Sequence, residues 1–506
     1  MTATTTRRPW RLALAVAAAS AVAVIGIGAP AAFAASVIDP DATGSITVHK
    51  HETPAGTAGD GTELTPGPTS DPVAGVDFTV RQITGVDLGT NAGWLLAQEL
   101  YVGFDPLDPE ADIVSPYGFG TPEVQTTTAT GLAEFTGLPV GLYLVEETFT
   151  PDGVVGSAPF LVTIPITDPA DDSNWIYDVH VYPKNSVVTI EKAVEDTNDY
   201  VEGDKVEWII TSEIPEPTSS TAEDITAYSV VDDLDSRLAV VAADVAVTLI
   251  NPAVTLASTD YEVIVGDNPA TTVVEDDNTV SVVFTAAGLD TLEANRASQV
   301  QVTIGTTVLE TGIIPNDATL FTSNPYSNSK VDSNTVETCW GAVNITKVDA
   351  DNNATPLAGA VFDLYSSTLT DPTLADLTLV VPSDAAKVTI TTDANGEASI
   401  DLLRCSDFED NAALSPVRTY YLVETTAPDG YELLAQPVPF TITYTDVSNY
   451  TPTSIGLDLQ IENVKKFILP LTGGSGTGLL YLVGFGLVIG GVVFLVIRRR
   501  GAKSHS

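Results

Sequence analysis

Hydrophobic and polar residues alternate in short runs along most of the chain. Valine, isoleucine and threonine dominate runs such as 45–48 (Ser-Ile-Thr-Val) and 440–444 (Phe-Thr-Ile-Thr-Tyr), and Asp, Gly, Asn and Pro separate them. Alternation with a period of two, interrupted by turn residues, is typical of strands in all-β sandwiches. Away from the two ends of the chain we find no long stretch with helical period. The pattern therefore predicts an all-β fold.

Two blocks of sequence, about 40–186 and 341–466, repeat the same series of signatures. Each has a strand that ends in lysine, then Pro-x-Ala-Gly, and then Tyr-x-(Leu/Val)-x-Glu-Thr, at 344–347, 356–359 and 420–425 in the later block and at 47–50, 72–75 and 143–148 in the earlier one. Both blocks should share one fold. Extra segments at 52–71 and about 89–124 are predicted to be loops that decorate the first block. Residues 187–340 lack the signatures and are predicted to form a different β-domain.

The two ends of the chain have the composition of processing and membrane segments. Arginines at 7, 8 and 11 precede an Ala/Val/Ile-rich run that closes in Ala-Phe-Ala at 32–34, the order of a secretory signal peptide, so the mature chain should begin near Ala35 or Ser36. An uncharged apolar run from Leu479 to Ile497 precedes three arginines. It is long enough for one membrane helix, with the arginines on the cytoplasmic side. Most of the protein should then lie outside the membrane.

The charge and the cysteine count narrow the class of protein. With 67 acidic against 21 basic residues the net charge is −46, which argues against nucleic acid and anionic membrane surfaces as partners. Cys339 and Cys405 are the only cysteines, and in an exported protein they favour one disulfide over two unpaired buried thiols.

The sequence contains no pattern of a known turnover site. The histidines at 49, 51, 180 and 505 have no zinc-like spacing, and neither a nucleophile elbow nor a phosphate loop is present. We expect no cofactor and no turnover enzyme. The sequence does not decide whether the Asp-rich loops of the first block bind calcium, because no spacing of ligands specifies such a site.

The C-terminal region contains a processing motif, Leu469-Pro470-Leu471-Thr472-Gly473, followed by the apolar run and the basic tail. This order resembles the cell-wall sorting signal of Gram-positive surface proteins. The resemblance implies that a membrane-bound sortase cleaves between Thr472 and Gly473 and holds the chain as a thioacyl intermediate until an amine takes it. The alternative interpretation of this region is an ordinary C-terminal membrane anchor.

A second motif precedes the middle block, Trp175-x-x-x-Val179-x-Val181-Tyr182-Pro183-Lys184. It resembles the pilin motif of sortase-assembled pili, and each residue that the motif specifies is present. The resemblance implies that Lys184 is the nucleophile that a pilin sortase joins to the threonine of the next subunit. The alternation predicts a terminal or edge strand that Pro183 ends, which leaves Lys184 at a domain junction.

The last block resembles the collagen-adhesin B-type domain, and 420–431 resembles the E-box of pilin subunits. The resemblance implies an isopeptide bond between Lys347 and Asn463 with Glu424 as its catalyst. The chemistry is reasonable, because burial favours a neutral lysine nucleophile and a protonated glutamate that can shuttle protons.

The other two blocks contain candidates for the same chemistry. The middle block resembles the A-type domain, which implies a bond between Lys192 and Asn316 with catalytic Asp232; Asn334 and Asp233 remain rivals. In the first block a candidate bond would join Lys50 to Asn185 with Glu147 as catalyst. First domains of this family often lack the bond, so the resemblance does not decide whether the first block forms it.

Across the mature chain the sequence resembles major, shaft-forming pilins. We expect three tandem immunoglobulin-like β-sandwiches, 36–186, 187–340 and 341–466, between a signal peptide (1–35) and a sorting signal (467–506). Implied partners are pilin-specific and housekeeping sortases, identical subunits joined head to tail, tip and basal pilins, peptidoglycan, and a host receptor or other bacteria. The expected location is a wall-anchored surface fimbrium that supports adhesion or biofilm, with a precursor transiently in the plasma membrane. The alternatives are a monomeric wall-anchored adhesin and a minor or basal pilin.

Overall fold

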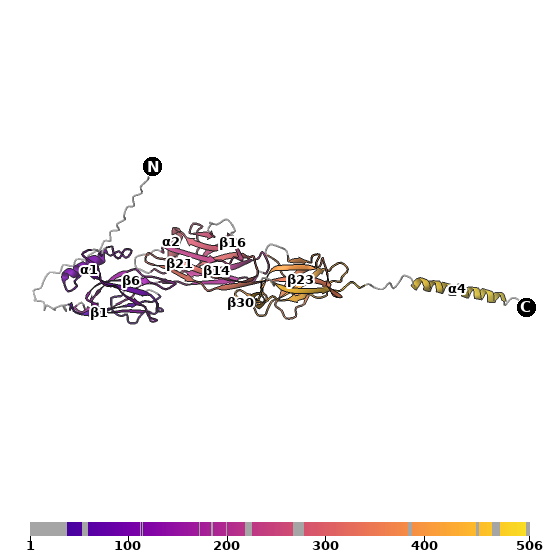
Figure 1. The fold of residues 1–506 in the computed structure, drawn as a ribbon, viewed down its shortest axis with the longest axis horizontal. Coiled ribbons are helices and arrows are strands. Elements are labelled where there is room, and N and C mark those ends of the chain that lie inside the picture. Colours follow the sequence, from indigo (N-terminus) through magenta and orange to yellow (C-terminus); the bar gives the residue numbers. More distant parts are fainter. Residues whose placement is uncertain are drawn as a thin grey trace, which may run out of the picture.

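The molecule is a row of three β-sandwiches, as the sequence predicted (Figure 1). The computed structural model describes residues 38–467 and the helix 476–501, except for 53–58, 112, 114, 172, 184–185, 199, 218–224, 267–277, 383–386 and 452–454. The N-terminal and C-terminal sandwiches lie at opposite ends of the row. The two ends of the row are therefore far apart and are formed by different sandwiches.

The N-terminal sandwich packs a small mixed sheet on a larger antiparallel one. In the small sheet the first strand, β1, runs parallel to the last strand, β11, and antiparallel to β5. Ile46, Phe78 and Phe135 are among the residues that fill the space between the sheets. The strands are β1 (Thr43–His49), β5 (Leu132–Pro139) and β11 (Asp178–Val181) in one sheet, and β2 (Asp77–Thr84), β3 (Gly118–Phe119), β4 (Glu123–Thr126), β6 (Gly141–Phe149) and β8 (Phe160–Ile164) in the other.

The C-terminal sandwich repeats this topology, as its repeated signatures predicted. Its first strand, β23, is again parallel to its last strand, β33, and antiparallel to β28. The first sheet contains β23 (Val336–Asp349), β24 (Asn352–Pro356), β28 (Glu397–Arg404) and β33 (Leu457–Asn463), and the second contains β25 (Val361–Ser367), β26 (Thr378–Leu379), β27 (Thr389–Thr391), β31 (Thr419–Thr426) and β32 (Val438–Phe440).

The middle sandwich is wholly antiparallel and has a core of its own that includes Trp208 and Tyr228. One sheet has the order β13 (Ile190–Glu195), β14 (Lys205–Glu213), β19 (Gln299–Val308), β16 (Leu238–Ile250). The other has the order β17 (Tyr261–Val265), β18 (Thr279–Phe284), β15 (Ala227–Asp233), β21 (Ala318–Ser323), β22 (Asn328–Asp332).

Strand β23 joins the middle and last sandwiches. Its first half pairs with β20 (Gly312–Asn316), and Trp340 packs into the middle core. Its second half pairs with β28 and β33, and Val343 packs into the last core. The boundary expected at 340/341 thus falls inside one continuous strand. Between the first two sandwiches β12 (Ser186–Val187) pairs with β7 (Val154–Val155).

Our expectation of loops at 89–124, without a helical stretch, is wrong in part. Helix α1 (Asn91–Gly103) begins at Thr90, whose hydroxyl accepts a hydrogen bond from the backbone of Gly93. Its inward residues cover the outer face of the larger sheet and build a second apolar cluster there. The helical period is hard to read because outward residues such as Leu95 and Tyr101 are also apolar.

The other helices are short, apart from one at the C-terminal end. Within the chain they are α2 (Ala286–Ala294), α3 (Tyr444–Ser448) and the single turn η1 (Leu374–Asp376). We predicted a membrane span over 479–497, where the structure has helix α4 (Gly476–Gly501). Among the described residues, no helix is long and apolar enough to cross a membrane. The predicted signal peptide and sorting pentapeptide lie outside the described residues.

Candidate functional sites

Lys347, Asn463 and Glu424 meet in the core of the C-terminal sandwich. The parallel pairing puts Lys347 opposite Ile461, two residues before Asn463 on β33. Lys347 Nζ donates a hydrogen bond to Asn463 Oδ1, and Asn463 Nδ2 lies 3.0 Å from each carboxylate oxygen of Glu424. Lys347 Nζ is 3.6 Å from Glu424 Oε1. The structure thus brings together the three residues that the sequence selected.

The surroundings of this triad shift the Lys347 amine toward its neutral form. The side chains of Lys347 and Glu424 are fully buried, and Lys347 Nζ lies 5.7 Å from the ring centroid of Phe362. Burial lowers the pKa of Lys347 to about 8, against the opposing effect of the nearby Glu424. A fraction of the amine is then uncharged near neutral pH, and it lies against the carboxamide that it would attack.

The middle sandwich has an equivalent site on β13, β15 and β20. Lys192 Nζ donates to Asp232 Oδ2 at 2.5 Å and to the backbone oxygen of Asp317 at 3.1 Å. Asn316 Nδ2 lies 3.4 Å from the same Asp232 oxygen. Burial lowers the pKa of Lys192 and raises the pKa of Asp232, so burial shifts both groups toward their neutral forms, against the attraction between their charged forms.

The two rivals occupy other positions in this sandwich. Asn334 holds the backbone of β13: its Oδ1 accepts from Lys192 N at 2.9 Å and its Nδ2 donates to Lys192 O at 2.8 Å. Asp233 follows Asp232 on β15, so it faces the opposite side of the strand, where it is exposed. The structure places Asp232 against the Lys192 amine and Asn316 against the same Asp232 oxygen, whereas neither Asn334 nor Asp233 is shown to bind the amine.

The N-terminal sandwich contains a buried lysine at the equivalent position. Lys50 directly follows β1, its Nζ binds Glu147 Oε1, and it lies 5.8 Å from the ring centroid of Phe78. The other Glu147 oxygen accepts a hydrogen bond from the backbone of Ser157. Burial lowers the pKa of Lys50. The third member of this candidate, Asn185, lies outside the described residues.

The described pilin-motif residues, on β10, on the edge strand β11 and just after it, are held by contacts with their surroundings. Trp175, on β10 (Trp175–Ile176), stacks on Trp94 of α1 with ring centroids 5.4 Å apart. Val179 is buried in the core, and Val181 packs against it. The Tyr182 hydroxyl accepts from the backbone of Leu64 at 2.8 Å, and its ring stacks on His49. Lys184 itself, like Thr472, lies outside the described residues.

A histidine pair beside the motif was missed from the sequence, where histidines were considered only as zinc ligands. His49 Nε2 lies 2.8 Å from His180 Nδ1. Because β1 and β11 are parallel and pair Thr47 with His180, the two rings come from adjacent strands. Burial and the neighbouring His180 lower the pKa of His49 to about 4. In the described part of the chain, no group of three or more His, Cys, Asp or Glu side chains could hold a metal.

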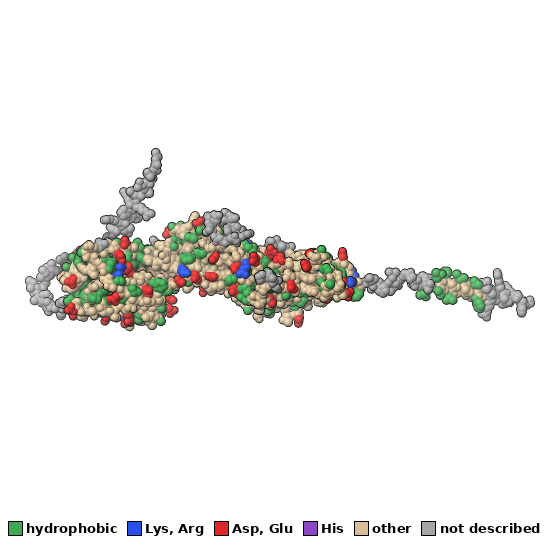
Figure 2. Space-filling view, in the orientation of Figure 1, with side chains coloured by type: hydrophobic (Ala, Val, Ile, Leu, Met, Phe, Trp, Pro, Cys, Tyr) green, Lys and Arg blue, Asp and Glu red, His purple; other side chains and the backbone are tan. Residues whose placement is uncertain are grey.

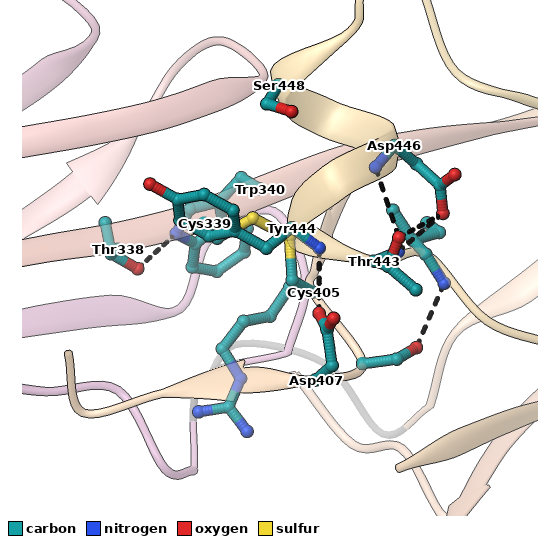
Figure 3. The surroundings of a disulfide bond; sticks show 12 residues. Thr338, Cys339, Trp340, Cys405, Asp407, Thr443, Tyr444, Asp446 and Ser448 are labelled. Atoms are coloured by element: carbon teal, nitrogen blue, oxygen red, sulfur yellow. Dashed lines mark hydrogen bonds between the residues drawn. A yellow bond between two sulfur atoms is a disulfide. The ribbon is translucent and has the colours of Figure 1, made fainter. Parts of the chain in front are cut away.

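The predicted disulfide between Cys339 and Cys405 is confirmed (Figure 3). Cys339 lies on β23, Cys405 directly follows β28, and the Cα atoms are 5.4 Å apart. Cys405 N also donates to Cys339 O at 2.9 Å. Nearby, the backbone nitrogen of Tyr444 donates to Asp407 Oδ1 at 2.8 Å. The bridge therefore fixes β23 to β28 where the strand leaves the middle sandwich.

Comparisons with known proteins agree with this geometry. Residues 41–186 match the family model of the Gram-positive pilin subunit D1, N-terminal domain, and residues 341–454 match that of a prealbumin-like fold domain. The chain is 34% identical to fimbrial subunit type 1 of Actinomyces viscosus, over 94% of each chain. It is 33% identical to fimbrial subunit type 2 of Actinomyces naeslundii, over 91% of this chain and 90% of the relative.

A solved structure extends the similarity to the arrangement of the sandwiches. The full-length major pilin SpaD of Corynebacterium diphtheriae superimposes with a TM-score of 0.69 at 29% identity. The match covers 85% of this chain and 99% of SpaD. The chain belongs to the family of fimbrial subunits, the structural proteins that polymerise into the surface pili of Gram-positive bacteria.

Proposed function

We propose that this protein is the shaft subunit of a covalent pilus, and that Thr472 of one subunit is joined to Lys184 of the next. The observation that carries the proposal is the position of the pilin motif. Strand β11 ends at Val181, three residues before Lys184 and just ahead of the middle sandwich, whereas the sorting signal follows the sandwich at the other end of the row (Figure 1). A contact between two different ends repeats without closing, and so gives a filament.

The joining chemistry needs two acyl transfers. The sortase thiol attacks the Thr472 carbonyl, the bond to Gly473 breaks, and the new amino terminus leaves with a proton. The Lys184 amine then attacks the thioester, forms an amide and releases the thiol. Each subunit serves once as acyl donor and once as amine acceptor. A housekeeping sortase would transfer the last subunit to peptidoglycan, which gives a wall-anchored fimbrium.

We further propose single-turnover isopeptide bonds inside the sandwiches. In the last sandwich the Lys347 amine attacks Asn463 Cγ, the Cγ–Nδ2 bond breaks, and ammonia leaves with a proton relayed by Glu424. The hydrogen bonds of Asn463 Nδ2 to both Glu424 oxygens support this relay. Lys192, Asn316 and Asp232 would react in the same way in the middle sandwich.

The N-terminal sandwich is a third candidate. Val48 pairs with Val181, as Ile345 pairs with Leu459 in the last sandwich. Counting along the sequence, the lysine follows two residues after the first member of each pair, and the asparagine four residues after the second, which gives the candidates Lys50 and Asn185. The buried pair of Lys50 with Glu147 supports the same chemistry here.

These bonds would suit a filament under tension. Each would cross-link the first strand of a sandwich to a distant part of its chain, where backbone hydrogen bonds contribute only about 1 kcal/mol net each. The Cys339–Cys405 bridge adds a further covalent link at the joint with the middle sandwich. A shaft of this kind would carry load between the wall and an attached host cell or bacterium.

The deciding experiment is an immunoblot of muramidase-released wall proteins from cells that carry the native chain or Lys184→Ala. We expect a high-mass ladder that survives boiling in detergent and reductant, and its collapse to monomer in the variant. A native chain that runs as one band, unchanged by the substitution, would contradict the shaft and favour the monomeric anchored adhesin. A single added step, without a ladder, would indicate a minor or basal pilin.

A further inference from the structure

The chain that leaves the last sandwich is held by a short run of backbone hydrogen bonds. The three residues after β33, 464–466, pair antiparallel with the chain at the end of the E-box. Glu432 N donates to Val464 O at 2.9 Å. Lys466 N donates to Gly430 O at 2.9 Å. We call this contact the exit clasp, because it fixes the chain beyond its last strand.

A tight turn presents the partner segment of the clasp. Tyr431 N donates to Pro428 O at 3.0 Å, and Gly430 between them has a φ of +87°. A positive φ at the third position is what a type II turn requires, and glycine adopts it without strain. The corresponding turn of the N-terminal sandwich, 151–154, has the same hydrogen bond and a glycine with a φ of +81°.

The N-terminal sandwich also repeats the clasp itself. Strand β12 pairs antiparallel with β7 there, as Lys465 pairs with Tyr431 in the last sandwich. The bond from Val188 N to Gly153 O, at 2.9 Å, matches the second bond of the exit clasp. In the N-terminal sandwich this pairing leads directly into β13 of the middle sandwich. In the last sandwich it leads to the sorting signal, where one subunit would be joined to the next.

A polar contact secures the exit clasp at the place where the N-terminal sandwich pairs two valines. Asp349 lies two residues after Lys347 on β23, and its side chain is 4% exposed. Its Oδ2 accepts a hydrogen bond from the Tyr431 hydroxyl at 3.0 Å and lies 2.8 Å from Lys465 Nζ. A single exposed ion pair contributes little, but a nearly buried carboxylate shared by two partners holds both of them.

The clasp determines how much of the chain is free before the sorting threonine. Phe467 N donates to Glu432 Oε1 at 3.2 Å, so the chain is held as far as Phe467. From there to Thr472 an extended chain spans about 17 Å, at ~3.3–3.6 Å per residue. With the clasp open the chain would be free from Val464 on, and the span would be about 30 Å.

We propose that Asp349, Tyr431 and Lys465 are positioning residues for the joining of subunits. They keep the chain on the last sandwich as far as Phe467, so that only 468–472 form the flexible link to the next subunit. This short link would limit how far consecutive subunits swing. The effect on the filament rests on the proposed function, whereas the clasp itself can be tested in a single chain.

The first test is limited trypsin digestion of the full-length chain in detergent, with the cut sites mapped by mass spectrometry. Basic side chains are few on the face that Figure 2 shows, and some lie where the chain leaves the last sandwich. Lys465 and Lys466 are trypsin sites within the clasp, so cleavage there follows the fraction of molecules in which the clasp is open. We expect slow cleavage of the native chain and cleavage several-fold faster in Asp349→Ala, which removes the shared partner.

The matched control is Asp351→Ala. Its carboxylate lies 3.5 Å from Lys465 Nζ but is 78% exposed, so the variant should be cut as slowly as the native chain. Lys465→Arg keeps both the cation and the trypsin site and should also stay protected. Tyr431→Phe removes only the hydroxyl and should be cut at a rate between those of the native chain and Asp349→Ala.

Hydrogen exchange separates an open clasp from a misfolded sandwich. In Asp349→Ala the amides of Glu432 and Lys466 should lose protection, because they donate the two bonds of the clasp. The amides of β31 should keep theirs. If β31 loses protection as well, Tyr431→Phe and Lys465→Arg decide the matter, since they change the clasp without removing a buried carboxylate.

The second test measures the persistence length of muramidase-released pili by electron microscopy. Asp349→Ala changes neither reacting group, so the high-mass ladder on the immunoblot should be unchanged. The persistence length should fall about twofold, in line with a flexible link of about nine residues in place of five. Pili of Asp351→Ala should match the native ones.

The outcomes separate the clasp from polymerisation. Rapid cleavage of the native chain at Lys465 or Lys466, or equal cleavage in Asp349→Ala, would overturn the clasp whether or not pili form. Faster cleavage with an unchanged persistence length would overturn the positioning role. If the native chain gives no high-mass ladder, the proposed shaft fails together with the effect on the filament, and the trypsin and exchange results still decide the clasp.

Discussion

Arg404 of the last sandwich forms an ion pair with Asp196 of the middle sandwich in a joint where neither side chain is exposed. Arg404 Nη1 lies 2.9 Å from Asp196 Oδ1, and the same oxygen accepts from the backbone of Asp410 at 2.9 Å. The second Asp196 oxygen accepts from Thr338 on β23 at 2.6 Å. Arg404 Nη2 also binds Glu409 at 2.9 Å. Buried charges with this many partners should fix the angle between the two sandwiches.

Arg404→Ala should destabilise the joint strongly, because it leaves Asp196 as an uncompensated buried charge. Losing one partner of a buried ion pair costs about 3–5 kcal/mol. Calorimetry of the released mature protein should show a lower unfolding transition for the last two sandwiches. The control is Lys205→Ala, which removes a half-exposed ion pair with Asp244 and should cost below about 1 kcal/mol. Equal effects from the two variants would contradict a joint held by buried charge.

The Cys339–Cys405 bridge should contribute to the same joint. The double variant Cys339→Ala/Cys405→Ala removes a cross-link between residues 66 positions apart, and the expected loss is about 2–4 kcal/mol. Because both thiols are removed, no unpaired cysteine complicates the comparison. The readout is protease sensitivity of the β23–β28 region at rising temperature, which should increase in the variant. Unchanged cleavage would mean that the buried Arg404 contacts are sufficient without the disulfide.

Intact mass spectrometry should report each internal isopeptide bond as the loss of one ammonia. Asn316→Ala should abolish the bond of the middle sandwich and leave that of the last sandwich in place. Asn334→Ala is the matched control: it removes two hydrogen bonds to the backbone of Lys192 and should keep the ammonia loss. The reverse result would make Asn334 the acceptor. Glu424→Ala should block the bond of the last sandwich in the same way.

The repeat and the lysine sites could be predicted from sequence for a physical reason. Strand register fixes which side chains share a core, so a lysine that closes the first strand and an asparagine on the last strand meet wherever the topology recurs. The signatures around Lys347 and Asn463 therefore carried three-dimensional information. The choice of Asn316 over Asn334 needed the structure, because Asn316 at the end of β20 and Asn334 just after β22 both lie close to Lys192 or its partner Asp232.

Other features had no readable signal. Helix α1 is apolar on its outward side as well, which blurs the helical period that would have predicted it. The contact of Arg404 with Asp196 joins residues 208 positions apart in two different sandwiches, so no local pattern indicates it. The pairing of His49 with His180 depends on parallel strands whose partners are far apart in sequence.

The His49–His180 contact should make strand β11 less stable in acid. Burial and His180 lower the pKa of His49 to about 4, against 6.5 for a free histidine, while Glu63 acts in the opposite direction and His51 in the same one. The folded state therefore binds this proton less readily than the unfolded state. The stability that the neutral His49 contributes is complete above pH 6.5 and falls as the pH drops from 6.5 toward 4. The measurement is the hydrogen-exchange protection of the β1 and β11 amides at pH 7 and pH 4.5.

His49→Phe keeps a ring against Tyr182 but cannot be protonated, so the amide protection of this variant should change less between the two pH values. If both proteins lose protection equally, the acid sensitivity of β11 comes from other groups.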